Sequence, residues 1–526
     1  MATNNFLEFN SNKLNMQNDS EYAAESQRTN GVIGGIAKSK MHNKLFRQLS
    51  VMVSAIGEAI KNTGHDASDS DMQALANAIP ESFAMRPYVD AQLASSANQH
   101  TENMLEHSFI NNLKLFFAYK AIGDGTNHPL SEKYSTLADA QKKYPTAIAL
   151  TEYIDQLAIQ TYINDVSNAG GGVVYIPKGT YNYSKLVIAR DNVIIHGEGQ
   201  EVSILQCVSG DLTSYKNSII FGKENNTPIK NIGIDNLKIK NANGNNGVLL
   251  EFNCPYLLDI HNLNIDGIGA NVTCLKIINP NQVRIDKFSF IAYSAHGIWA
   301  VPLTNGGTGA STDLYISNGH LDSGDITKGI GLLLDGTGID YLTAVNCSNL
   351  EVFRNQYPLM CNSIHYSKFL NCYFDTSTFF SKTQGYCTDI LFQGCWFATS
   401  NSSGLSIEET SNLIELSGCT IFNNRLHGIN IIGASKNISI HHCKIIDNNQ
   451  SNTVGGQGVN IQGGISKFDI SHNTIANNVL NNGHQQNMVA VLTGNSDYYI
   501  ITNNRGGTVF DGGTGVNKNV SNNFVA

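Results

Sequence analysis

Four carboxylates in the middle of the chain have the residue types and the spacing of a general acid and base pair. They are Asp322, Asp325, Glu351 and Asp375, and they follow short strand-like segments of one pattern. Hydrolysis of a glycosidic bond requires two carboxyl groups, about 5 to 5.5 Å apart for retention or about 6.5 to 9.5 Å for inversion. Crowded like charges raise one pKa, which leaves a protonated acid beside an ionised base. We therefore predict that these four residues are catalytic; the alternative is that each Asp caps its own turn.

Aromatic, histidine and arginine side chains near these acids are predicted to bind the substrate: Tyr293, His296, Trp299, His320 and Arg354. Trp299 is one of two tryptophans, and an exposed indole is a platform for a sugar ring, although a core position suits it as well. Arg354 is expected either to hold an acidic sugar or to pair with Glu351. The same basic groups suit β-elimination, so a lyase remains an alternative to a hydrolase.

A repeated strand pattern explains how such residues come together. Eleven segments share one alternation of apolar and polar residues, and the aligned positions are Leu237, Leu263, Phe288, Gly319, Cys347, Cys372, Cys395, Cys419, Cys443, Asn473 and Asn503. Their spacing of 23 to 31 residues is typical of a parallel β-solenoid, in which each coil buries its apolar face only against its neighbours. On this alignment Asp322, Glu351 and Asp375 follow the aligned position by three, four and three residues on successive coils.

Two further patterns support this interpretation. A second apolar strand follows the first in many repeats, starting near residues 247, 297, 329, 404, 428 and 458. The cysteines from Cys347 to Cys443 are predicted to form a ladder of small side chains that face inward or lie at a turn. They include no CxxC pair, and a ladder roughly 20 Å long cannot surround one ion, so no metal site is expected there.

The first part of the chain has helical periodicity. Helices are predicted over 42–61, over 71–79 after a Ser-Asp-Ser cap, and over 89–117, packing either between chains or as an intrachain bundle. A short helix at 154–166 and a strand at 173–176 are expected to cap the open end of the stacked sheet. We predict a helical region over 1–118, a segment over 119–200 that leads into and caps the solenoid, and the solenoid with its binding groove over 201–526.

Composition excludes several classes of protein. Lys and Arg number 34 against 43 Asp and Glu, a net charge of −9 that argues against a basic nucleic-acid surface. Neither a secretory signal nor an 18-residue apolar run is present, so membrane insertion is not expected. The ten cysteines all follow residue 200 and are expected to be reduced. The sequence shows no phosphate loop, dinucleotide fingerprint or nucleophile elbow, and we expect no cofactor and no metal.

The residues around the start of the solenoid carry a family likeness. AIGDGTNHP at 121–129, AIQTYINDVSNAGGGVVYIPKGTY at 158–181 and the Asn-rich coils that follow resemble the pectate-lyase-like right-handed parallel β-helix of bacteriophage and prophage tailspikes. Residues 21–60 resemble the virion-attachment region of phage tail fibres. The resemblance implies an all-β fold, a right-handed parallel β-helix with a small helical N-terminal attachment and neck region.

The resemblance also implies a function. It implies a homotrimer, joined to phage tail or baseplate proteins by its N-terminal region, that binds and usually cleaves a bacterial surface polysaccharide: capsule, O-antigen or exopolysaccharide. We expect an endo-acting tailspike hydrolase, made in the bacterial cytoplasm and carried on the virion to the bacterial surface. A polysaccharide lyase and a non-catalytic receptor-binding tail fibre are the alternatives. An unsaturated product would identify the lyase, and new reducing ends without unsaturation would identify the hydrolase. The absence of both products would identify the receptor-binding fibre.

Overall fold

The computed structural model describes residues 118–525 apart from 209–217, 243, 245, 304–310, 337–339 and 478–482, together with Leu115 and isolated residues of the N-terminal segment. The chain divides into two compact units, 1–104 and 105–526. Six isolated residues are described within the predicted helix at 42–61, and each of them is helical. The helices predicted at 71–79 and 89–117 lie outside the described residues apart from Leu115.

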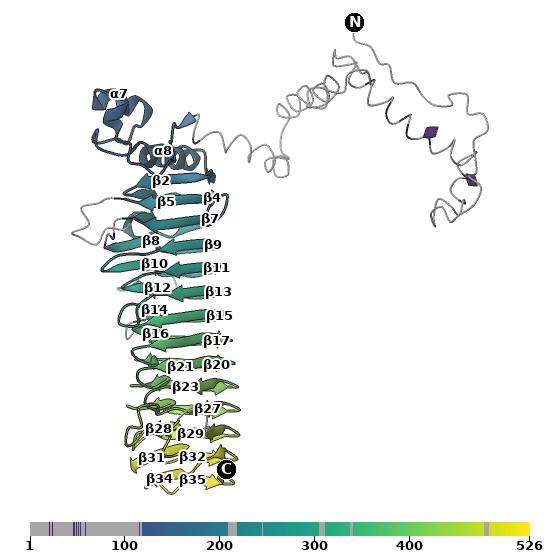
Figure 1. Cartoon of the computed structure of the whole chain (residues 1–526), viewed down its shortest axis with the longest axis vertical. Helices are drawn as coiled ribbons and strands as arrows, with labels where there is room; N and C mark the ends of the chain where they lie inside the picture. Colours follow the sequence, from purple (N-terminus) through teal and green to yellow (C-terminus); the bar gives the residue numbers. More distant parts are fainter. Residues whose placement is uncertain are drawn as a thin grey trace. The chain divides into compact units, whose positions relative to one another are not determined.

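The second unit is a right-handed parallel β-helix, as predicted (Figure 1). Each coil has three strand positions, which we name stack 1, stack 2 and stack 3 in chain order. Stacks 1 and 2 form a 23-stranded sheet and stack 3 forms a 13-stranded sheet. The eleven repeated segments form stacks 1 and 2, and the second series of predicted strands forms stack 3.

In the long coils one strand supplies both stack 1 and stack 2: β7 (Ile229–Asn241), β9 (Pro255–Asp266), β11 (Asn281–Ile291), β13 (Thr312–Asp322) and β15 (Leu342–Asn355). The other strands of stack 1 are β1 (Gly172–Ile176), β4 (Val193–Gly197), β17 (Ile364–Leu370), β20 (Thr388–Gln393), β23 (Asn412–Ser417), β26 (Lys436–His441), β29 (Ser466–Ser471), β32 (Tyr499–Thr502) and β35 (Lys518–Ser521). The other strands of stack 2 are β2 (Gly179–Tyr183), β5 (Ser203–Cys207), β18 (Tyr373–Ser377), β21 (Trp396–Ser400), β24 (Thr420–Phe422), β27 (Lys444–Ile446), β30 (Thr474–Ala476), β33 (Arg505–Gly506) and β36 (Phe524–Val525). Stack 3 consists of β3 (Leu186–Ile188), β6 (Ile219–Phe221), β8 (Gly247–Asn253), β10 (Val272–Ile278), β12 (His296–Val301), β14 (Ile330–Asp335), β16 (Tyr357–Asn362), β19 (Ser381–Gln384), β22 (Leu405–Ile407), β25 (Ile429–Ile431), β28 (Val459–Ile461), β31 (Val489–Gly494) and β34 (Val509–Gly513).

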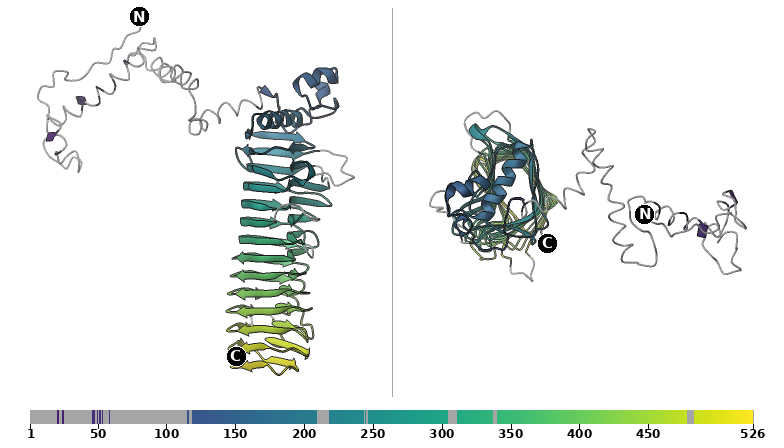
Figure 2. Two further views of the ribbon diagram at one scale, coloured as in Figure 1. Left: turned by 180° about the vertical axis from the view of Figure 1, so that it is seen from behind. Right: turned by 90° about the horizontal axis from the view of Figure 1, so that it is seen from above.

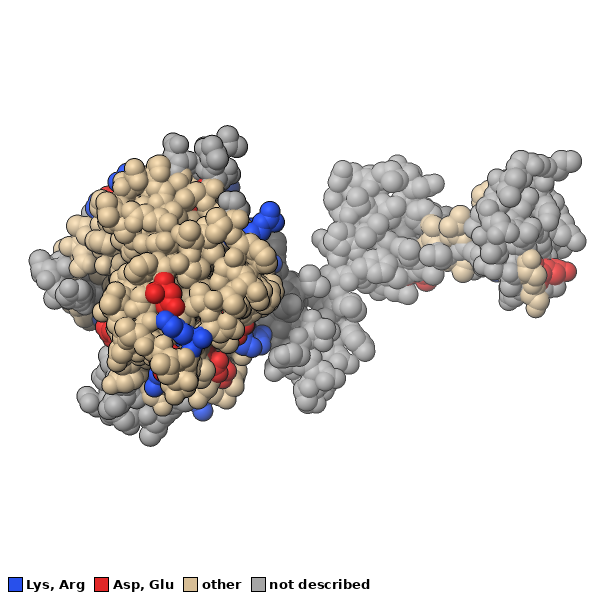
Figure 3. All heavy atoms as spheres, turned by 90° about the horizontal axis from the view of Figure 1, so that it is seen from below, with Lys and Arg blue, Asp and Glu red and all other residues tan. Residues whose placement is uncertain are grey.

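Helix α8 (Ile154–Asn168) covers the first coil (Figure 2). Its buried residues pack on β1, β2 and β3, so the helix and the strand predicted here are confirmed as a cap. The remaining described helices are η2 (Leu130–Glu132), α7 (Leu137–Lys143) and η3 (Glu224–Asn226). Figure 3, seen from the end opposite α8, shows a mainly uncharged surface with scattered acidic and basic side chains.

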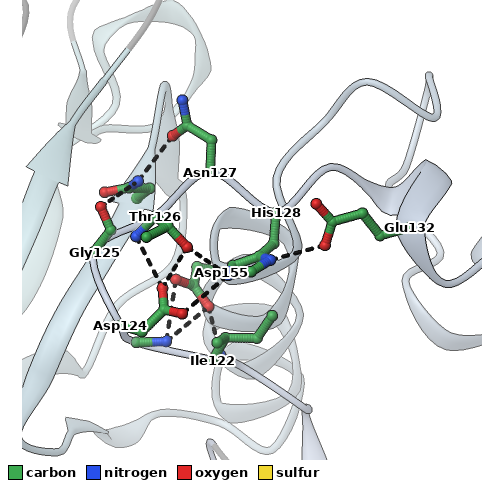
Figure 4. A network of polar contacts seen from close by, with 10 residues as sticks. Ile122, Asp124, Gly125, Thr126, Asn127, His128, Glu132 and Asp155 are labelled. Atoms are coloured by element: carbon green, nitrogen blue, oxygen red, sulfur yellow. Dashed lines mark hydrogen bonds and ion pairs between the residues drawn. The ribbon is translucent and has the colours of Figure 1, made fainter.

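The Gly-Asp-Gly turn joins the cap to the coils (Figure 4). The buried carboxylate of Asp155 in α8 accepts the backbone N–H of Ile122 at 2.6 Å, and Gly125 N–H donates to the carbonyl of Thr180 at 2.8 Å. Gly123 has φ of 69°, and a Cβ there would lie 2.7 Å from the ring of Tyr181. The turn therefore needs glycine both for its backbone and for its space.

Stack 1 turns into stack 2 at a residue with positive φ in eleven successive coils. These residues have φ between 51° and 63°: Asn236, Asn262, Lys287, Asn318, Asn349, Asn371, Gly394, Gly418, His442, His472 and Asn503. Asn and Gly tolerate this conformation best. The amides also stack, since Asn262 Nδ2 donates to Asn236 Oδ1 at 2.6 Å and Asn349 Nδ2 donates to Asn318 Oδ1 at 3.1 Å.

This corner corrects the predicted cysteine ladder. Cross-strand register places Cys347 beside Phe369, whereas the residue after the Asn349 corner, Leu350, follows Gly319 in the ladder. Cys347 and Leu350 both face inward because the left-handed residue between them interrupts the alternation of the strand. The aligned position on this coil is therefore Leu350, and the prediction for Cys347 was wrong. All ten cysteines are described and buried, and none of them forms a disulfide; their reduced state stays a prediction.

The connections from stack 2 to stack 3 differ in length while the strand register is kept. Residues 423–428 join β24 to β25, and the longer segment 447–458 joins β27 to β28. Ile429 nevertheless pairs with Val459 and Ile431 pairs with Ile461. Variation in the length of a coil is therefore absorbed outside the sheets.

Candidate functional site

The outer face of stack 2 carries three of the predicted catalytic carboxylates. Asp322 ends β13, Glu351 lies on β15 and Asp375 lies on β18. Phe353 pairs with Asp322 on one side and with Asp375 on the other, and Glu351 pairs with Tyr373. Their strand neighbours of opposite parity are core residues, so these side chains point outward. We call the surface formed by these five residues the acid face.

The register fixes the separations on the acid face. Neighbouring strands lie about 4.8 Å apart and rise about 3.3 Å per residue, so residues offset by two positions on adjacent strands lie roughly 8 Å apart. The backbone positions of Glu351 and Asp375 stand in this relation. A carboxyl separation of the same size would fall within the range of about 6.5 to 9.5 Å for inversion. Asp322 and Asp375 are two coils apart, or roughly 10 Å. The predicted offset of Glu351 was wrong, because it lies one residue after Leu350 and not in the row of Asp322.

Asp322 is held by Arg354. Arg354 Nε donates to Asp322 Oδ1 at 3.0 Å, its Nη2 bonds Oδ2, and the N–H of Gly324 donates to Oδ1 at 2.8 Å. The side chain of Asp322 is 11% exposed, and its hydrogen bond raises the pKa of Arg354. Arg354 thus pairs with Asp322 and not with Glu351, and its predicted contact with an acidic sugar stays a prediction. A carboxylate so fully bonded positions its arginine and is poorly placed to transfer a proton.

Asp325 caps the turn that follows β13. Its Oδ1 accepts the backbone N–H of Thr327 at 2.9 Å and the hydroxyl at 2.8 Å, and Lys328 Nζ lies 3.3 Å from Oδ2. The backbone hydrogen bond from Thr327, with the other two contacts, lowers the pKa of Asp325. The raised pKa expected of crowded acids is therefore not found here. Asp325 fits the turn-capping alternative.

Glu351 and Asp375 have milder partners. His320 Nδ1 lies 3.4 Å from Glu351 Oε2, and its Nε2 lies 3.9 Å from Asp322 Oδ2, so the imidazole bridges two acids. The hydroxyl of Thr376 donates to Asp375 Oδ1 at 3.0 Å. Within the described chain, neither Glu351 nor Asp375 forms an ion pair with lysine or arginine. These two carboxylates remain available for chemistry.

Aromatic side chains that the sequence reasoning missed continue the acid face. Trp396 follows Tyr373 in the same row at a ring distance of 5.8 Å, and Phe422 lies edge-on to Trp396 at 4.5 Å. Tyr373 is 44% exposed, and Trp396 and Phe422 are half-buried. Tyr373 and Trp396 occupy the position of Glu351 on the next two coils. The repeat period in the sequence could therefore have identified them. Aromatic faces beside two carboxylates are the groups that stack on sugar rings.

His296 and Trp299 lie on β12 in stack 3, away from the row of acids. Lys276 Nζ lies 4.3 Å from the centre of the Trp299 ring, and the His296 ring lies 5.0 Å from it, so the indole is already covered. His296 Nδ1 is 2.9 Å from the hydroxyl of Thr273, and Lys276 is 3.9 Å from Glu251. Burial, and secondly the charge of Lys276, lower the pKa of His296 to about 4. The imidazole is therefore neutral near pH 7.

Tyr293 is enclosed in the core. Its side chain is fully buried, and its hydroxyl donates to Asn355 Oδ1 at 2.6 Å. Its placement corrects the prediction that it binds substrate, because no ligand can reach it. Among the described residues, no three His, Cys, Asp or Glu side chains come together as metal ligands, and no helix is long and apolar enough to cross a membrane.

Comparison with known proteins agrees with the β-helix fold. Residues 152–324 match the family model described as "Rhamnogalacturonase A/epimerase, pectate lyase-like". This segment, about a third of the chain, is similar to that family. Beyond it, the same parallel coils continue to β36, with a register shift between Val491 and Gly494 where β31 pairs with β34. No curated protein matches the chain.

Solved structures with similar coils include two phage proteins and an enzyme. Pre-mature bacteriophage phi29 gene product 12 has 14% identity and a TM-score of 0.54 over 80% of this chain and 57% of its own. The tailspike gp49 from Pseudomonas phage LKA1 has 16% identity and a TM-score of 0.48 over 74% of this chain and 80% of its own. The A-module of the Azotobacter vinelandii mannuronan C-5 epimerase AlgE6 has 15% identity and a TM-score of 0.46 over 78% of this chain and 98% of its own. At 14% identity, the likeness to gene product 12 is one of fold.

Proposed function

We propose that this protein is a phage or prophage tailspike that binds a bacterial surface polysaccharide and cleaves it by endo-acting hydrolysis. The resemblance of the N-terminal segment and of the first turn to tailspikes supports a place on the virion, with attachment to tail or baseplate proteins through residues 1–118 and assembly as a homotrimer. The pectate-lyase-like β-helix supports a carbohydrate ligand. Capsule, O-antigen and exopolysaccharide are the substrate classes that follow.

One observation carries the hydrolytic mechanism: Glu351 and Asp375 lie roughly 8 Å apart on a face continued by aromatic rings. This separation leaves room for a water between the sugar and the base, as inversion requires. Glu351 is the more exposed carboxylate and is the proposed base. Asp375 lies between Phe353 and Ala398 in its row and is the proposed acid for the leaving oxygen. Tyr373 and Trp396 would hold the neighbouring sugar rings.

The test uses the purified full chain with a panel of bacterial capsules, O-antigens and exopolysaccharides. Reducing ends and the ultraviolet absorbance of unsaturated products are measured together. Glu351→Gln and Asp375→Asn should each lower the rate of reducing-end release by roughly a hundredfold to ten-thousandfold, the range for loss of a general acid or base. Asp325→Asn is the matched control, because Asp325 only caps a turn, and it should cleave at the rate of the parent protein.

The outcomes separate the mechanisms. NMR of the first product should show inverted anomeric configuration; a retained configuration would contradict the proposed pair. Cleavage that survives both substitutions would place the acids elsewhere, including on a second copy in the trimer. Binding without cleavage in the parent protein would make it the receptor-binding fibre.

A second candidate, a polysaccharide lyase, is favoured by His296, Trp299 and Lys276, which lie together in stack 3. The neutral imidazole of His296 can accept a proton, and Lys276 beside it can neutralise the carboxylate of a uronate. Unsaturated products that disappear in His296→Gln but persist in Glu351→Gln would establish this candidate in place of the hydrolase.

A further inference from the structure

A cavity of about 520 Å³ lies on the outer face of stack 1, on β9, β11 and β13. This volume falls within the range of about 300 to 1,000 Å³ for small-molecule sites. The cavity shares β13 with Asp322 of the acid face, but Tyr315 and Asp322 are seven residues apart and lie on opposite sides of the Asn318 corner. Seven residues of strand span roughly 20 Å. The cavity is therefore separate from the acid face.

Two rows of side chains line this cavity. The row on the strands consists of Asp259, Arg284 and Tyr315, which pair directly in the sheet on three successive coils. The row at the turn into stack 1 consists of Leu257, Gln282 and Asp313, whose φ angles are 57°, 54° and 58°. Neighbours within each row are about 4.8 Å apart. The register of the coils holds both rows in place.

The polar groups of the cavity have no side-chain partner among the described residues. Within the described chain, the guanidinium of Arg284, the amide of Gln282 and the carboxylates of Asp259 and Asp313 make no hydrogen bond or ion pair with another side chain. Arg284 is exposed, and Tyr315 is 42% exposed. By contrast, Asp286, one row away on β11, accepts hydrogen bonds from Ser317 and Asn318. The unpaired groups gather in the cavity.

The chemistry of these groups fits a sugar. Carboxylates and an amide accept and donate hydrogen bonds to neighbouring hydroxyls, a guanidinium donates to ring and hydroxyl oxygens, and a tyrosine face packs on the C–H side of a ring. Two carboxylates and one guanidinium give the cavity a net charge of −1 near pH 7. Coulomb repulsion therefore favours neutral sugars over uronates, sialic acids or sulfated sugars.

We propose that this cavity is a non-catalytic binding site for neutral sugar residues, distinct from the acid face. Tyr315 stacks on the ring of one sugar, and Leu257 packs beside that ring. Arg284, Asp259 and Asp313 form hydrogen bonds with the hydroxyls of the sugar. The site needs no cleavage to function. On a molecule that also degrades polysaccharide, it would retain the polymer while the acid face acts on it.

The test measures binding of neutral trisaccharides, built from hexoses, deoxyhexoses and N-acetylhexosamines, to the full chain on a glycan array and by saturation-transfer NMR. Acidic trisaccharides form the second arm. Tyr315→Ala and Arg284→Gln should each lower the affinity for a neutral trisaccharide by about tenfold, as expected for loss of one good contact. Tyr366→Ala is the matched control, because Tyr366 is 63% exposed and lies outside the cavity.

Three results would overturn the proposal: no neutral trisaccharide bound by the parent protein, binding of acidic sugars only, or binding unchanged in both cavity variants. Both substitutions change exposed side chains, and thermal unfolding at one scan rate confirms that each variant is folded. Reducing-end release measured on the same preparations keeps the two proposals apart. If the parent protein binds neutral trisaccharides but releases no reducing ends, the hydrolase proposal alone is contradicted. If the parent protein cleaves polysaccharide and trisaccharide binding is unchanged in both Tyr315→Ala and Arg284→Gln, the cavity proposal alone is contradicted.

Discussion

The roles of the four predicted carboxylates differ because their partners differ. Asp322 is tied to Arg354 and Asp325 to its own turn, while Glu351 and Asp375 keep free oxygens on an exposed face. Residue type and spacing alone gave all four the same role. The distinction rests on where a guanidinium or a backbone N–H lies, which depends on the exact turn that each strand makes.

At the residue scale, Tyr293→Phe tests the buried contact to Asn355. Removing the hydroxyl leaves Asn355 Oδ1 buried without its donor, which costs about 1 to 3 kcal/mol. We expect a lower thermal unfolding temperature at a fixed scan rate, with no change in cleavage of polysaccharide. Tyr366→Phe, at an exposed position, is the control and should leave the unfolding temperature unchanged.

His296 gives a prediction about pH. Its folded pKa of about 4 lies below the ordinary value of 6.5, because burial opposes the charged form. Protonation therefore favours the unfolded chain, and this contribution to stability is complete above pH 6.5 and lost as pH falls towards 4. NMR should show the ring signal of His296, assigned with His296→Gln, unshifted down to about pH 5. A midpoint near the ordinary value would contradict the burial described here.

At the scale of elements, the coils hold together through ladders in which each side chain contacts its counterpart above and below. Phe369 stacks on Phe392 at 4.9 Å and Phe374 on Phe397 at 5.3 Å. The Cys395 thiol donates to the carbonyl of Phe369 at 3.2 Å, so a small polarizable side chain closes the same layer. At another rung, Phe288 pairs directly with Gly319, so a large ring on one coil lies against a glycine on the next.

Gly319→Ala tests this matching of sizes. A Cβ at Gly319 would lie 2.0 Å from Phe288 Cζ, and overpacking of this kind costs about 1 to 3 kcal/mol. We expect a lower unfolding temperature that Phe288→Leu in the same chain partly restores. Gly507→Ala is the control, because its nearest neighbour would be 3.7 Å from the new Cβ. Equal effects of the two glycine substitutions would argue against a size constraint at this rung.

The sequence predicted the elements well and the faces less well. The repeats, the second strand series and the cap could be predicted because the alternation and the period of apolar residues can be read directly from the sequence. The alignment of the repeats was wrong at Cys347. Cys347 and Leu350 both face inward and are three residues apart, and only the left-handed conformation of Asn349 shows that Leu350 is the aligned position. His296 and Trp299 were grouped with the acids because closeness in sequence does not show which stack a strand joins.

At the scale of the whole molecule, the β-helix is a unit separate from the N-terminal segment. Residues 105–526 form one compact unit whose first coil is already covered by α8. We therefore expect a chain starting at residue 105 to keep the unfolding temperature of the β-helix. Sedimentation of the full and shortened chains tests the proposed trimer: a monomeric full chain would contradict it, and a trimer lost on shortening would assign assembly to residues 1–104.

The unequal connections between stack 2 and stack 3 make the surface open to engineering. The segment 447–458 is twice as long as its counterpart 423–428, yet the flanking strands keep their pairing, and Val454 within it is 90% exposed. A foreign peptide spliced in at Val454 should thus be displayed without refolding of the scaffold. Natural lineages have the same freedom, because insertions and deletions there can alter what the surface recognises while the coils below are inherited unchanged.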